Sequence, residues 1–290
     1  MNVLICGERG FIGRHVAAAL RAQDHQVRGL RQTVNGQPQA LDFCEATSPA
    51  RWRPWLEGID AVVNAVGVLR DTRRRPLSVV HTRAPVALFQ ACAELGVRRI
   101  VQVSALGVDA SPTAYATTKL AAETALNQLA AQGQVDAAIL RPSVVFGAGG
   151  AASEMFLNMA KLPVLSMPAP AFTAQIQPVA VQDVAELFAA LLGPQVTWCG
   201  TVACVGPQAL TTADFIGRLR QEMGKSAALR WPLPQVVGQA MARVGDLVPA
   251  SPFCSETLSL LSQDNTADAT AFSQLLGHAP RMPGLSKATA

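Results

Sequence analysis

Residues 2–13 read NVLICGERGFIG, and this stretch decides the fold. The short, mostly apolar run from Asn2 to Cys6 predicts a buried strand, and the helical spacing of apolar residues from Phe11 onward predicts a helix directly after it. Three glycines, at positions 7, 10 and 13, give the pattern GxxGxxG at the junction. Glycines placed between a strand and a helix in this way are typical of a turn that binds a dinucleotide, so we expect such a turn here.

Short runs rich in Val and Ile alternate with longer segments of helical period along the following 200 or so residues, which indicates a parallel sheet with helices on both faces. The predicted strands are 2–6, 26–30, 39–42, 61–65, 99–103, 137–140 and 202–205. The predicted helices are 11–23, 50–56, 77–95, 112–131 and 183–192. This order predicts an α/β fold with a Rossmann-type, doubly wound parallel sheet.

The rhythm changes after Gly147, where paired glycines and scattered prolines break the pattern of strands and helices. Further helices are predicted at 212–223, 235–244, 255–263 and 267–276. We therefore expect two domains. A dinucleotide-binding domain covers 1–147 and takes 176–206 back into its sheet, and a smaller, mostly helical substrate or cap region covers 148–175 and 207–290.

Composition excludes several classes of protein. The chain has 290 residues, of which 50% are hydrophobic, so disorder is excluded. No apolar run reaches the roughly 18 residues that a membrane-spanning helix needs. The 24 basic residues barely exceed the 20 acidic ones, so no nucleic-acid partner is expected. The first residues do not form a signal peptide, and the six cysteines and four histidines lack ligand spacing, so we expect a cytoplasmic protein with reduced thiols and no metal.

Each part of the glycine turn has an expected role. Gly7 lets the chain turn sharply, Gly10 lets the backbone approach a pyrophosphate, and Gly13 lets the helix lie close to the sheet. The N–H groups at the start of the helix, at Phe11 and Ile12, are expected to bind the phosphates.

Two arginines favour NADP(H) over NAD(H). An acidic residue at the end of the second strand would bind the adenosine ribose of NAD, but Arg31 stands there. Its guanidinium, together with Arg9 from the glycine turn, can bind a 2′-phosphate instead. The alternative is that either arginine is a solvated surface charge. Asp42 is the predicted partner of the adenine amino group, and its neighbour Phe43 is also expected to contact the cofactor.

The reactive pair comes from a single tyrosine, Tyr115, with Lys119 four residues later. On a helix these residues share a face, so the ammonium is expected to lower the pKa of the phenol from about 10 towards neutrality. Tyr115 can then exchange a proton with a carbonyl or alcohol while a hydride moves to or from nicotinamide. The alternative is a half-buried tyrosine beside a lysine that extends its ammonium to solvent.

These motifs together resemble the extended or atypical short-chain dehydrogenases/reductases, which are NAD-dependent epimerase/dehydratase-like proteins. They are GxxGxxG at 7–13, NAVG at 64–67, VSA at 103–105, the pair Tyr115 and Lys119, and LRPSVVFG at 140–147. Within that family, residues 62–69, 103–107 and 177–185 are similar to the subgroup that contains the accessory NAD(P)H-binding subunit of respiratory complex I. The resemblance covers roughly residues 1 to 225.

The resemblance assigns further residues to the cofactor and exposes one departure. It implies that a loop lines the ribose and phosphates, namely Asn64, Ala65, Val66 and Gly67. It implies that a second segment presents backbone to the carboxamide, namely Pro142, Ser143 and Val144. The position of Arg9 resembles that of an arginine in the GDP-fucose synthases, which supports NADP(H), and Lys119 would bind the nicotinamide ribose.

The departure is Ala105, which stands where the epimerases carry a catalytic serine or threonine. Loss of such a donor costs about 3–4 kcal/mol of transition-state stabilisation, so either Ser104, Ser111 or Thr113 replaces it or the chemistry is slow. Ser104 is equally interpretable as a structural hydroxyl at the end of a strand.

The substrate is expected to be an anionic or hydrophobic small molecule. An arginine-rich loop at the carboxyl edge of the sheet could hold a diphosphate or acidic group, unless it is only a solvated face; it consists of Arg70, Arg73, Arg74 and Arg75. Apolar residues at 155–159 and Phe172 favour a hydrophobic ligand, with core packing as the alternative. The oligomeric state stays open between monomer and homodimer.

Three functions are compatible with these residues. The leading hypothesis is an NADP(H)-dependent oxidoreductase or epimerase-type enzyme with Tyr115 as acid/base, Lys119 as the activating cation and Ser104 as the polarising group. The second is a weakly or non-catalytic NADPH-binding structural or sensor protein. The third is a nucleotide-sugar epimerase, against which Ala105 counts.

Overall fold

The computed structural model describes residues 1–34, 37–193, 196–247 and 254–285. The chain forms two compact units. Unit 1 consists of Met1–Pro142, Gln182–Ala203 and Gln274–Gly277. Unit 2 consists of Ser143–Val181, Cys204–Ser273 and His278–Ala290. Among the described helices, none combines the length and the apolar character that crossing a bilayer requires.

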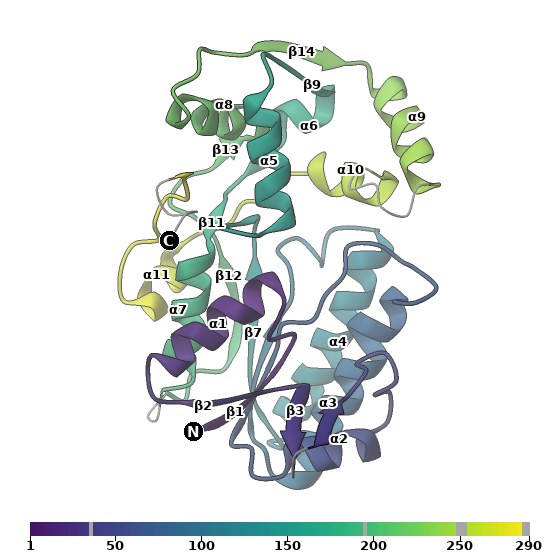
Figure 1. Ribbon diagram of the computed structural model, residues 1–290, viewed down its shortest axis with the longest axis vertical. Helices are drawn as coiled ribbons and strands as arrows, with labels where there is room; N and C mark the ends of the chain where they lie inside the picture. The colour runs from purple at the N-terminus through teal and green to yellow at the C-terminus, as the bar shows by residue number, and fades with distance from the viewer. Residues whose placement is uncertain (35–36, 194–195, 248–253, 286–290) are drawn as a thin grey trace. The chain divides into compact units, whose positions relative to one another are not determined.

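Unit 1 is built on a six-stranded sheet with the order β12-β7-β6-β5-β1-β2 (Figure 1). The strands are β1 (Asn2–Cys6), β2 (Gln26–Gly29), β5 (Ala61–Asn64), β6 (Arg99–Val103), β7 (Asp136–Pro142) and β12 (Gly200–Cys204). The pairs β1–β2, β1–β5, β5–β6 and β6–β7 are parallel. Strand order reverses at β1, which has β2 on one side and β5 on the other, and ligands of this fold bind outside the carboxyl ends of the strands at such a point.

Helices cover both faces of this sheet, and the predicted doubly wound α/β fold is confirmed. They are α1 (Phe11–Arg21), α2 (Pro49–Leu56), η1 (Ser78–Arg83), α3 (Ala84–Leu95), α4 (Ala114–Ala131) and α7 (Val181–Leu191). Figure 1 shows α2, α3 and α4 on one side of the strands and α1 and α7 on the other. On the first side Trp52, Phe89 and Leu126 pack with Leu4 and Ile100 of the sheet in one buried cluster.

Two predicted elements of unit 1 were wrong in detail. The predicted strand at 39–42 lies at 37–40, as β4, and pairs antiparallel with β3 (Arg31–Val34) in a separate two-stranded sheet. Pro38 within β4 has no N–H to donate, which suits an edge position outside the main sheet. The predicted helix at 77–95 begins as the π-helical turn η1, because Pro85 cannot donate the hydrogen bond that a regular helix needs there.

Unit 2 consists of short strand pairs and helices. Its strands are β8 (Val145–Phe146), β9 (Val164–Pro168), β10 (Gln175–Ile176), β11 (Val179–Ala180), β13 (Leu210–Thr211) and β14 (Leu229–Leu233). The pairs β8–β11 and β9–β14 are parallel, and β10–β13 is antiparallel. The helices are α5 (Ala151–Lys161), α6 (Ala169–Thr173), α8 (Thr212–Glu222), α9 (Gln235–Asp246) and α10 (Ser255–Leu261). Helix α11 (Thr270–Leu276) follows, and the chain crosses from unit 2 to unit 1 within it.

A second apolar core holds unit 2 together. The rings of Phe146 and Phe156 each meet the ring of Phe215 edge-on, with centroids 5.4 and 5.5 Å apart. The apolar residues that the sequence offered as a hydrophobic-ligand site belong to this core: Met155, Phe156, Leu157, Met159 and Phe172. The core-packing interpretation of these residues therefore holds.

Candidate functional site

The glycine turn lies between β1 and α1. Gly7 has φ of +86°, a conformation that favours glycine, and its carbonyl accepts a hydrogen bond of 2.8 Å from the Gly10 N–H. A Cβ on Gly7 would lie 3.1 Å from the backbone of Ala65, and one on Gly13 would collide with the Gly7 carbonyl oxygen. The turn therefore packs so closely against the start of α1 and against the loop after β5 that side chains at these positions would displace it.

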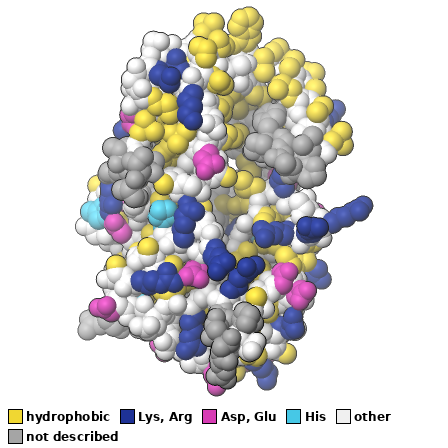
Figure 2. Space-filling model, viewed as in Figure 1, with side chains coloured by type: hydrophobic (Ala, Val, Ile, Leu, Met, Phe, Trp, Pro, Cys, Tyr) yellow, Lys and Arg dark blue, Asp and Glu magenta, His cyan; other side chains and the backbone are white. Residues whose placement is uncertain are grey.

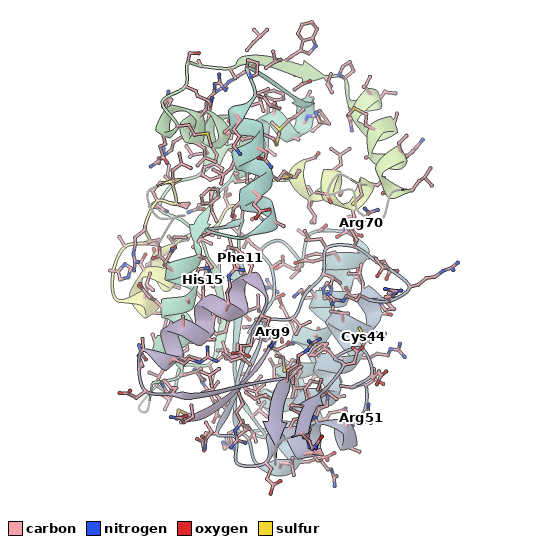
Figure 3. The ribbon with its side chains drawn as sticks, in the orientation of Figure 1. Arg9, Phe11, His15, Cys44, Arg51 and Arg70 are labelled. Atoms are coloured by element: carbon pink, nitrogen blue, oxygen red, sulfur yellow. The ribbon has the colours of Figure 1, made fainter. Side chains whose placement is uncertain are left out.

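A cavity of about 710 Å³ opens beside this turn, within unit 1. The predicted cofactor residues that line it are Gly7, Arg9, Gly10, Arg31, Asp42, Phe43, Ala65, Val66 and Gly67. Arg9, Cys44 and Arg51 reach it from three separate segments of the chain (Figure 3). The structure thus brings the glycine turn, the two predicted arginines and the loop after β5 to one cavity at the carboxyl edge of the sheet.

The other predicted cofactor residues lie elsewhere. Phe11, Ile12 and Gly13 form the first turn of α1. Asn64 is buried and orients the loop after β5: its amide donates to Gln102 Oε1 at 2.8 Å, and its Oδ1 accepts from the Val66 N–H at 3.2 Å.

The predicted carboxamide segment straddles the two units. Pro142 ends a segment of unit 1, whereas Ser143 and Val144 belong to unit 2. There the Ser143 hydroxyl donates to the Asn265 carbonyl at 3.0 Å, and the Ser143 N–H donates to the Cys204 carbonyl at 3.0 Å. This segment therefore stays a prediction from the resemblance.

The cavity contains more positive charge than the sequence predicted, because Arg51 and Arg75 line it together with Arg9 and Arg31. Arg51 pairs with Glu45 across 3.2 Å. Among the described residues no carboxylate pairs with Arg9, Arg31 or Arg75.

The carboxylates of the same wall already have partners. Glu8 pairs with Arg21 across 2.5 Å, and Asp42 Oδ1 accepts the Cys44 N–H at 2.8 Å. Burial, and after it the Asp42 carboxylate, raises the pKa of the Cys44 thiol. The cavity therefore attracts an anion but offers no activated thiol.

Of the arginine-rich loop, Arg75 is the residue that reaches the cavity, and Arg73 and Arg74 are exposed. In the sequence, the run of arginines within positions 70–75 was the only feature that indicated a binding role for Arg75. Arg51 gave no signal, because it lies on α2 within no motif.

Helix α4 carries the reactive pair. Thr113 caps it, accepting the Ala116 N–H at 3.2 Å, so that Tyr115 falls in the first turn and Lys119 one turn later. Tyr115 is half-buried, and Lys119 is only 3% exposed. Lys119 therefore does not extend to solvent.

The ammonium of Lys119 is held at the edge of the sheet. It donates to the Val103 carbonyl oxygen at 3.1 Å, and a Cβ on Gly67 would lie 3.3 Å from its Nζ. Burial lowers the pKa of Lys119 to about 8, partly opposed by the charge of Glu123. The cation of the pair therefore lies between the end of β6 and the loop after β5.

His81, a residue that sequence reasoning missed, connects that loop to α4. Its Nε2 accepts the Val68 N–H at 3.1 Å, and its Nδ1 lies 3.1 Å from Thr118 Oγ1. Because the Thr118 hydroxyl donates to the Ala114 carbonyl at 2.7 Å, this network assigns the proton of the neutral imidazole to Nδ1. Burial, followed by the charge of Lys119, lowers the pKa of His81 to about 3, so the ring is neutral at physiological pH.

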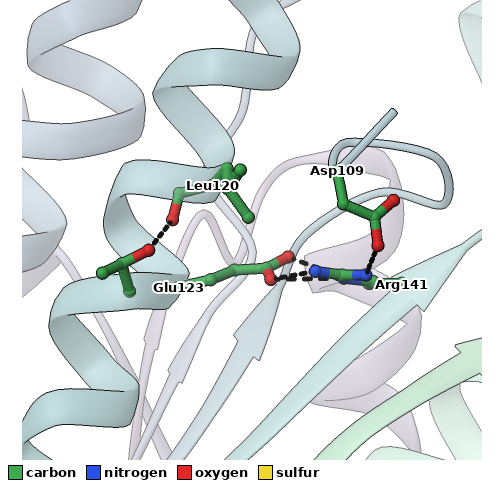
Figure 4. A network of polar contacts seen from close by, with 5 residues as sticks. Asp109, Leu120, Glu123 and Arg141 are labelled. Atoms are coloured by element: carbon green, nitrogen blue, oxygen red, sulfur yellow. Dashed lines mark hydrogen bonds and ion pairs between the residues drawn. The ribbon is translucent and has the colours of Figure 1, made fainter. Parts of the chain in front are cut away.

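A buried ion pair fixes α4 against the sheet (Figure 4). Arg141 of β7 contacts Glu123 through Nη2 at 2.6 Å and Nε at 3.1 Å, and its Nη1 contacts Asp109 at 2.8 Å. Glu123 is 2% exposed and follows Lys119 by one helical turn. The Arg141 guanidinium also holds the pKa of Asp109 below its usual value. The ion pair therefore restricts rotation of the helix that carries Tyr115 and Lys119.

Ser104 retains an unused hydroxyl. Its Oγ is buried and has no hydrogen-bond partner among the described residues, although its N–H donates to the Leu140 carbonyl at 2.7 Å. The two other predicted replacements for the hydroxyl absent at Ala105 are engaged with each other, because Ser111 Oγ lies 3.2 Å from Thr113 Oγ1. Of the three, Ser104 is the one whose side-chain hydroxyl makes no hydrogen bond within the described part of the chain.

The chain belongs to the NAD dependent epimerase/dehydratase family, whose model matches residues 3–195. This is the extended short-chain dehydrogenase/reductase type of protein, and the family binds a nicotinamide dinucleotide. The chain is 25% identical to the mitochondrial NADH dehydrogenase (ubiquinone) 1 alpha subcomplex subunit 9 of Rattus norvegicus, over 87% of this chain and 69% of that protein.

Two solved structures share the fold. UDP-glucuronic acid 4-epimerase of Bacillus cereus, in complex with UDP-glucuronic acid and NAD, has a TM-score of 0.71 and 17% identity over 98% of this chain and 95% of that one. An NADPH-dependent quinone oxidoreductase of Escherichia coli, complexed with NADPH, has a TM-score of 0.70 and 17% identity over 97% and 96%. The predicted family is confirmed.

Proposed function

We propose that this protein is an NADP(H)-dependent oxidoreductase or epimerase-type enzyme of the extended short-chain class. The observation that carries the proposal is the buried ammonium of Lys119, held beside Gly67 and the Val103 carbonyl with Tyr115 one turn earlier on the same helix. A buried cation with a lowered pKa beside a ligand cavity is typical of a functional site.

The chain's residues fit the dinucleotide. Side chains at Gly7 and Gly13 would displace the glycine turn, whose close packing holds the chain where the first turn of α1 would present its N–H groups to the pyrophosphate. Lys119 would bind the nicotinamide ribose, and the dinucleotide supplies hydride-transfer chemistry when bound. Tyr115 would give or take the proton at the substrate oxygen, with the Ser104 hydroxyl as the group that polarises it.

The uncommitted guanidiniums support NADP(H). Arg9, Arg31 and Arg75 line the cavity without a carboxylate partner among the described residues, and a 2′-phosphate would supply the missing anion. We expect Arg31→Ala and Arg75→Ala each to weaken NADPH binding about tenfold or more while leaving NADH binding within about twofold. Arg53→Ala is the matched control, because Arg53 pairs with Glu94 outside the cavity. Equal affinity of the wild type for NADH and NADPH would contradict the NADP(H) preference.

The catalytic part is tested with Tyr115→Phe. NADPH oxidation is measured against a panel of quinones, ketones and nucleotide sugars, and the best substrate is then followed with the variant. We expect turnover to fall by about 10²–10⁴ while the Kd for NADPH stays within about twofold, because the phenol moves a proton and the ring remains. Unchanged turnover would show that Tyr115 is not the acid/base.

Ala105 favours a second candidate function, an NADPH-binding structural or sensor protein with little or no catalysis. The relative from Rattus norvegicus is named as a subunit of an assembly, which is compatible with such a role. Stoichiometric NADPH that copurifies with the protein and resists oxidation by every compound of the panel would favour this function. A nucleotide-sugar epimerase is the third candidate, and titration calorimetry with UDP- and GDP-sugars distinguishes it from the other two. A cytoplasmic location and a monomeric or homodimeric state remain predictions.

A further inference from the structure

The outer face of unit 2 gathers most of the exposed apolar side chains of the protein. Of the thirteen large apolar residues that are exposed in the described part of the chain, nine lie on or next to β9, β14 and α9. They are Leu162, Val164, Leu229, Trp231, Val236, Val237, Met241, Val244 and Leu247. Figure 2 shows hydrophobic side chains gathered over β14 and α9. We call these nine residues the outer apolar face.

Strand pairing explains how β9 and β14 contribute to this face. Their parallel register places Val164 beside Leu229 and Ser166 beside Trp231, and residues paired in this way point to the same side of a sheet. The alternate residues of β9, Leu165 and Met167, point to the other side, into the core of unit 2. The outward side of the two-stranded sheet therefore carries Val164, Leu229 and Trp231 together with one hydroxyl, that of Ser166, and these four residues bear no charge.

Helix α9 turns its larger apolar side chains outward. The residues that it buries are small, Gly238, Ala242 and Gly245, and a Cβ on Gly238 would collide with Pro168. Val236 and Leu247, in contrast, are 75% and 81% exposed. An apolar stripe at helical spacing that faces away from the core is typical of a helix that lies in a membrane interface.

The charges next to the outer apolar face are mostly positive. Lys161, Lys225 and Arg243 are exposed, and none of the three pairs with a carboxylate among the described residues. Asp246, the acidic residue of α9, is engaged by Ser255, whose N–H and hydroxyl both donate to its carboxylate. The outer apolar face and the cations beside it are therefore complementary to a surface that has an apolar interior and negatively charged groups on its outside.

We propose that the outer apolar face docks on an anionic phospholipid bilayer. Trp231, 60% exposed, has the amphipathic ring that is enriched at membrane interfaces, and unpaired cations around an apolar face bind anionic headgroups. The outer strand does not suit strand addition by a second protein, because Pro232 interrupts the N–H groups that such pairing needs. The cavity beside α9, of about 460 Å³, takes in the polar residues Gln235, Gln239 and Arg243 and so is not an apolar groove for a helix.

Vesicle flotation tests the proposal with the full-length protein. Vesicles of phosphatidylcholine and phosphatidylglycerol in equal parts are compared with vesicles of phosphatidylcholine alone, and the tryptophan emission, to which Trp231 contributes as one of four tryptophans, is followed in both. We expect the protein to float with the anionic vesicles, with a blue shift of the emission. Three neutral substitutions at highly exposed positions, Val236→Gln, Val244→Gln and Leu247→Gln combined, are expected to lower the partition coefficient about tenfold or more.

Matched variants separate apolar from electrostatic binding. Leu69→Gln with Leu95→Gln removes exposed apolar side chains from unit 1 and is expected to leave binding within about twofold. Lys225→Gln and Arg243→Gln are each expected to weaken binding to the anionic vesicles roughly fivefold. The thermal midpoint of each variant shows that the fold persists.

Three results would overturn the proposal. The first is a wild type that binds neither kind of vesicle or binds both equally. The second is an equal loss of binding in the unit 1 variant and in the triple variant. The third is a dimer, observed by light scattering without lipid, that the triple variant converts to a monomer, because a second copy would then cover the face.

Discussion

The imidazole of His81 meets the ring of Tyr115 edge-on, with centroids 5.2 Å apart and an angle of 89° between the planes. The same imidazole accepts the Val68 N–H from the loop after β5. A buried, neutral histidine therefore links the loop that borders the cofactor cavity to the first turn of α4. In the proposed enzyme His81 is a positioning residue, since it orients the tyrosine and the loop without contacting the reacting atoms.

Substitution of His81 by Phe should remove the hydrogen bonds that connect the loop after β5 to α4 while keeping an aromatic ring beside Tyr115. His81→Phe leaves the Val68 N–H without an acceptor, and we expect the free energy of unfolding at pH 7 to fall by about 1–3 kcal/mol. The pKa of His81 is about 3 in the folded protein and 6.5 ordinarily, so its contribution to stability is present above pH 6.5 and is lost as the pH falls below it.

The variant should accordingly lose stability less steeply than the wild type between pH 6.5 and 5. Urea unfolding of wild type and variant at several pH values measures this. An identical pH dependence in wild type and His81→Phe would contradict the assignment of a neutral, buried imidazole.

Lys119 should favour NADPH binding but lower the stability of the folded protein. Its pKa is about 8 in the folded protein, against 10.5 ordinarily, so below pH 8 the fold carries the full penalty of burying the charge. Between pH 8 and 10.5 the unfolded chain binds more protons, and stability contributed by this group rises with pH. We therefore expect Lys119→Met to be about 1–3 kcal/mol more stable at pH 7, even after loss of the hydrogen bond to Val103, and to bind NADPH more weakly.

Denaturant unfolding and NADPH titration measure the two effects on the same sample. Lys161→Met, at an exposed position, is the control and should change neither. A Lys119→Met variant that is less stable than the wild type throughout this pH range would show that the ammonium is not an unfavourable burial.

Gly67 should be intolerant of even a methyl group. The Cβ of Gly67→Ala would lie 3.3 Å from Lys119 Nζ and 3.8 Å from His81 Nε2, so it presses on the proposed anchor. We expect a loss of NADPH affinity corresponding to about 1–3 kcal/mol. Gly217→Ala is the control: its nearest neighbour would be Arg230 Nη2 at 3.7 Å, and alanine favours the helix there. Calorimetric titration of both variants checks this, and equal affinities would contradict crowding at Lys119.

The two carboxylates that pair with Arg141, those of Glu123 and Asp109, should differ greatly in how much they contribute to the stability of the fold. Glu123 is buried, so Glu123→Gln leaves the largely buried Arg141 with the exposed Asp109 as its remaining carboxylate partner, and we expect stability to fall by about 3 kcal/mol. Asp109 is 60% exposed at its side chain, and Asp109→Asn should cost about 0–1 kcal/mol. Thermal and denaturant unfolding compare the two, and similar losses would show that burial does not decide the strength of this network.

The sequence predicted the parts of the molecule that local patterns encode. The strand-turn-helix at residues 2–13 and the helix that carries Tyr115 and Lys119 follow from glycine spacing and periodicity, and both are present. The orphaned hydroxyl of Ser104 also has its signal, because the resemblance places it at the end of a strand. Local patterns and the family resemblance therefore found the fold, the family and nine of the nineteen residues that line the cavity.

What escaped prediction depends on contacts between distant segments. His81 reaches Val68 and Thr118 across 13 and 37 residues, and no spacing within its own helix marks it. Arg51 enters the cavity only because α2 packs where it does. The predicted strand at 39–42 belongs to the separate pair β3–β4 and not to the main sheet, because the sequence of a short polar strand does not reveal which strand it pairs with.

The seclusion of Lys119 has a practical consequence for observing this protein in solution. Amine-reactive reagents should modify exposed Lys161 and Lys225 within the first moments, whereas Lys119 becomes reachable only when α4 separates from β6. The slow appearance of its acylated peptide in a mass spectrum would thus time the opening of that helix. A ligand seated against the ammonium should lengthen this time, which gives a way to screen for occupants before any turnover is known.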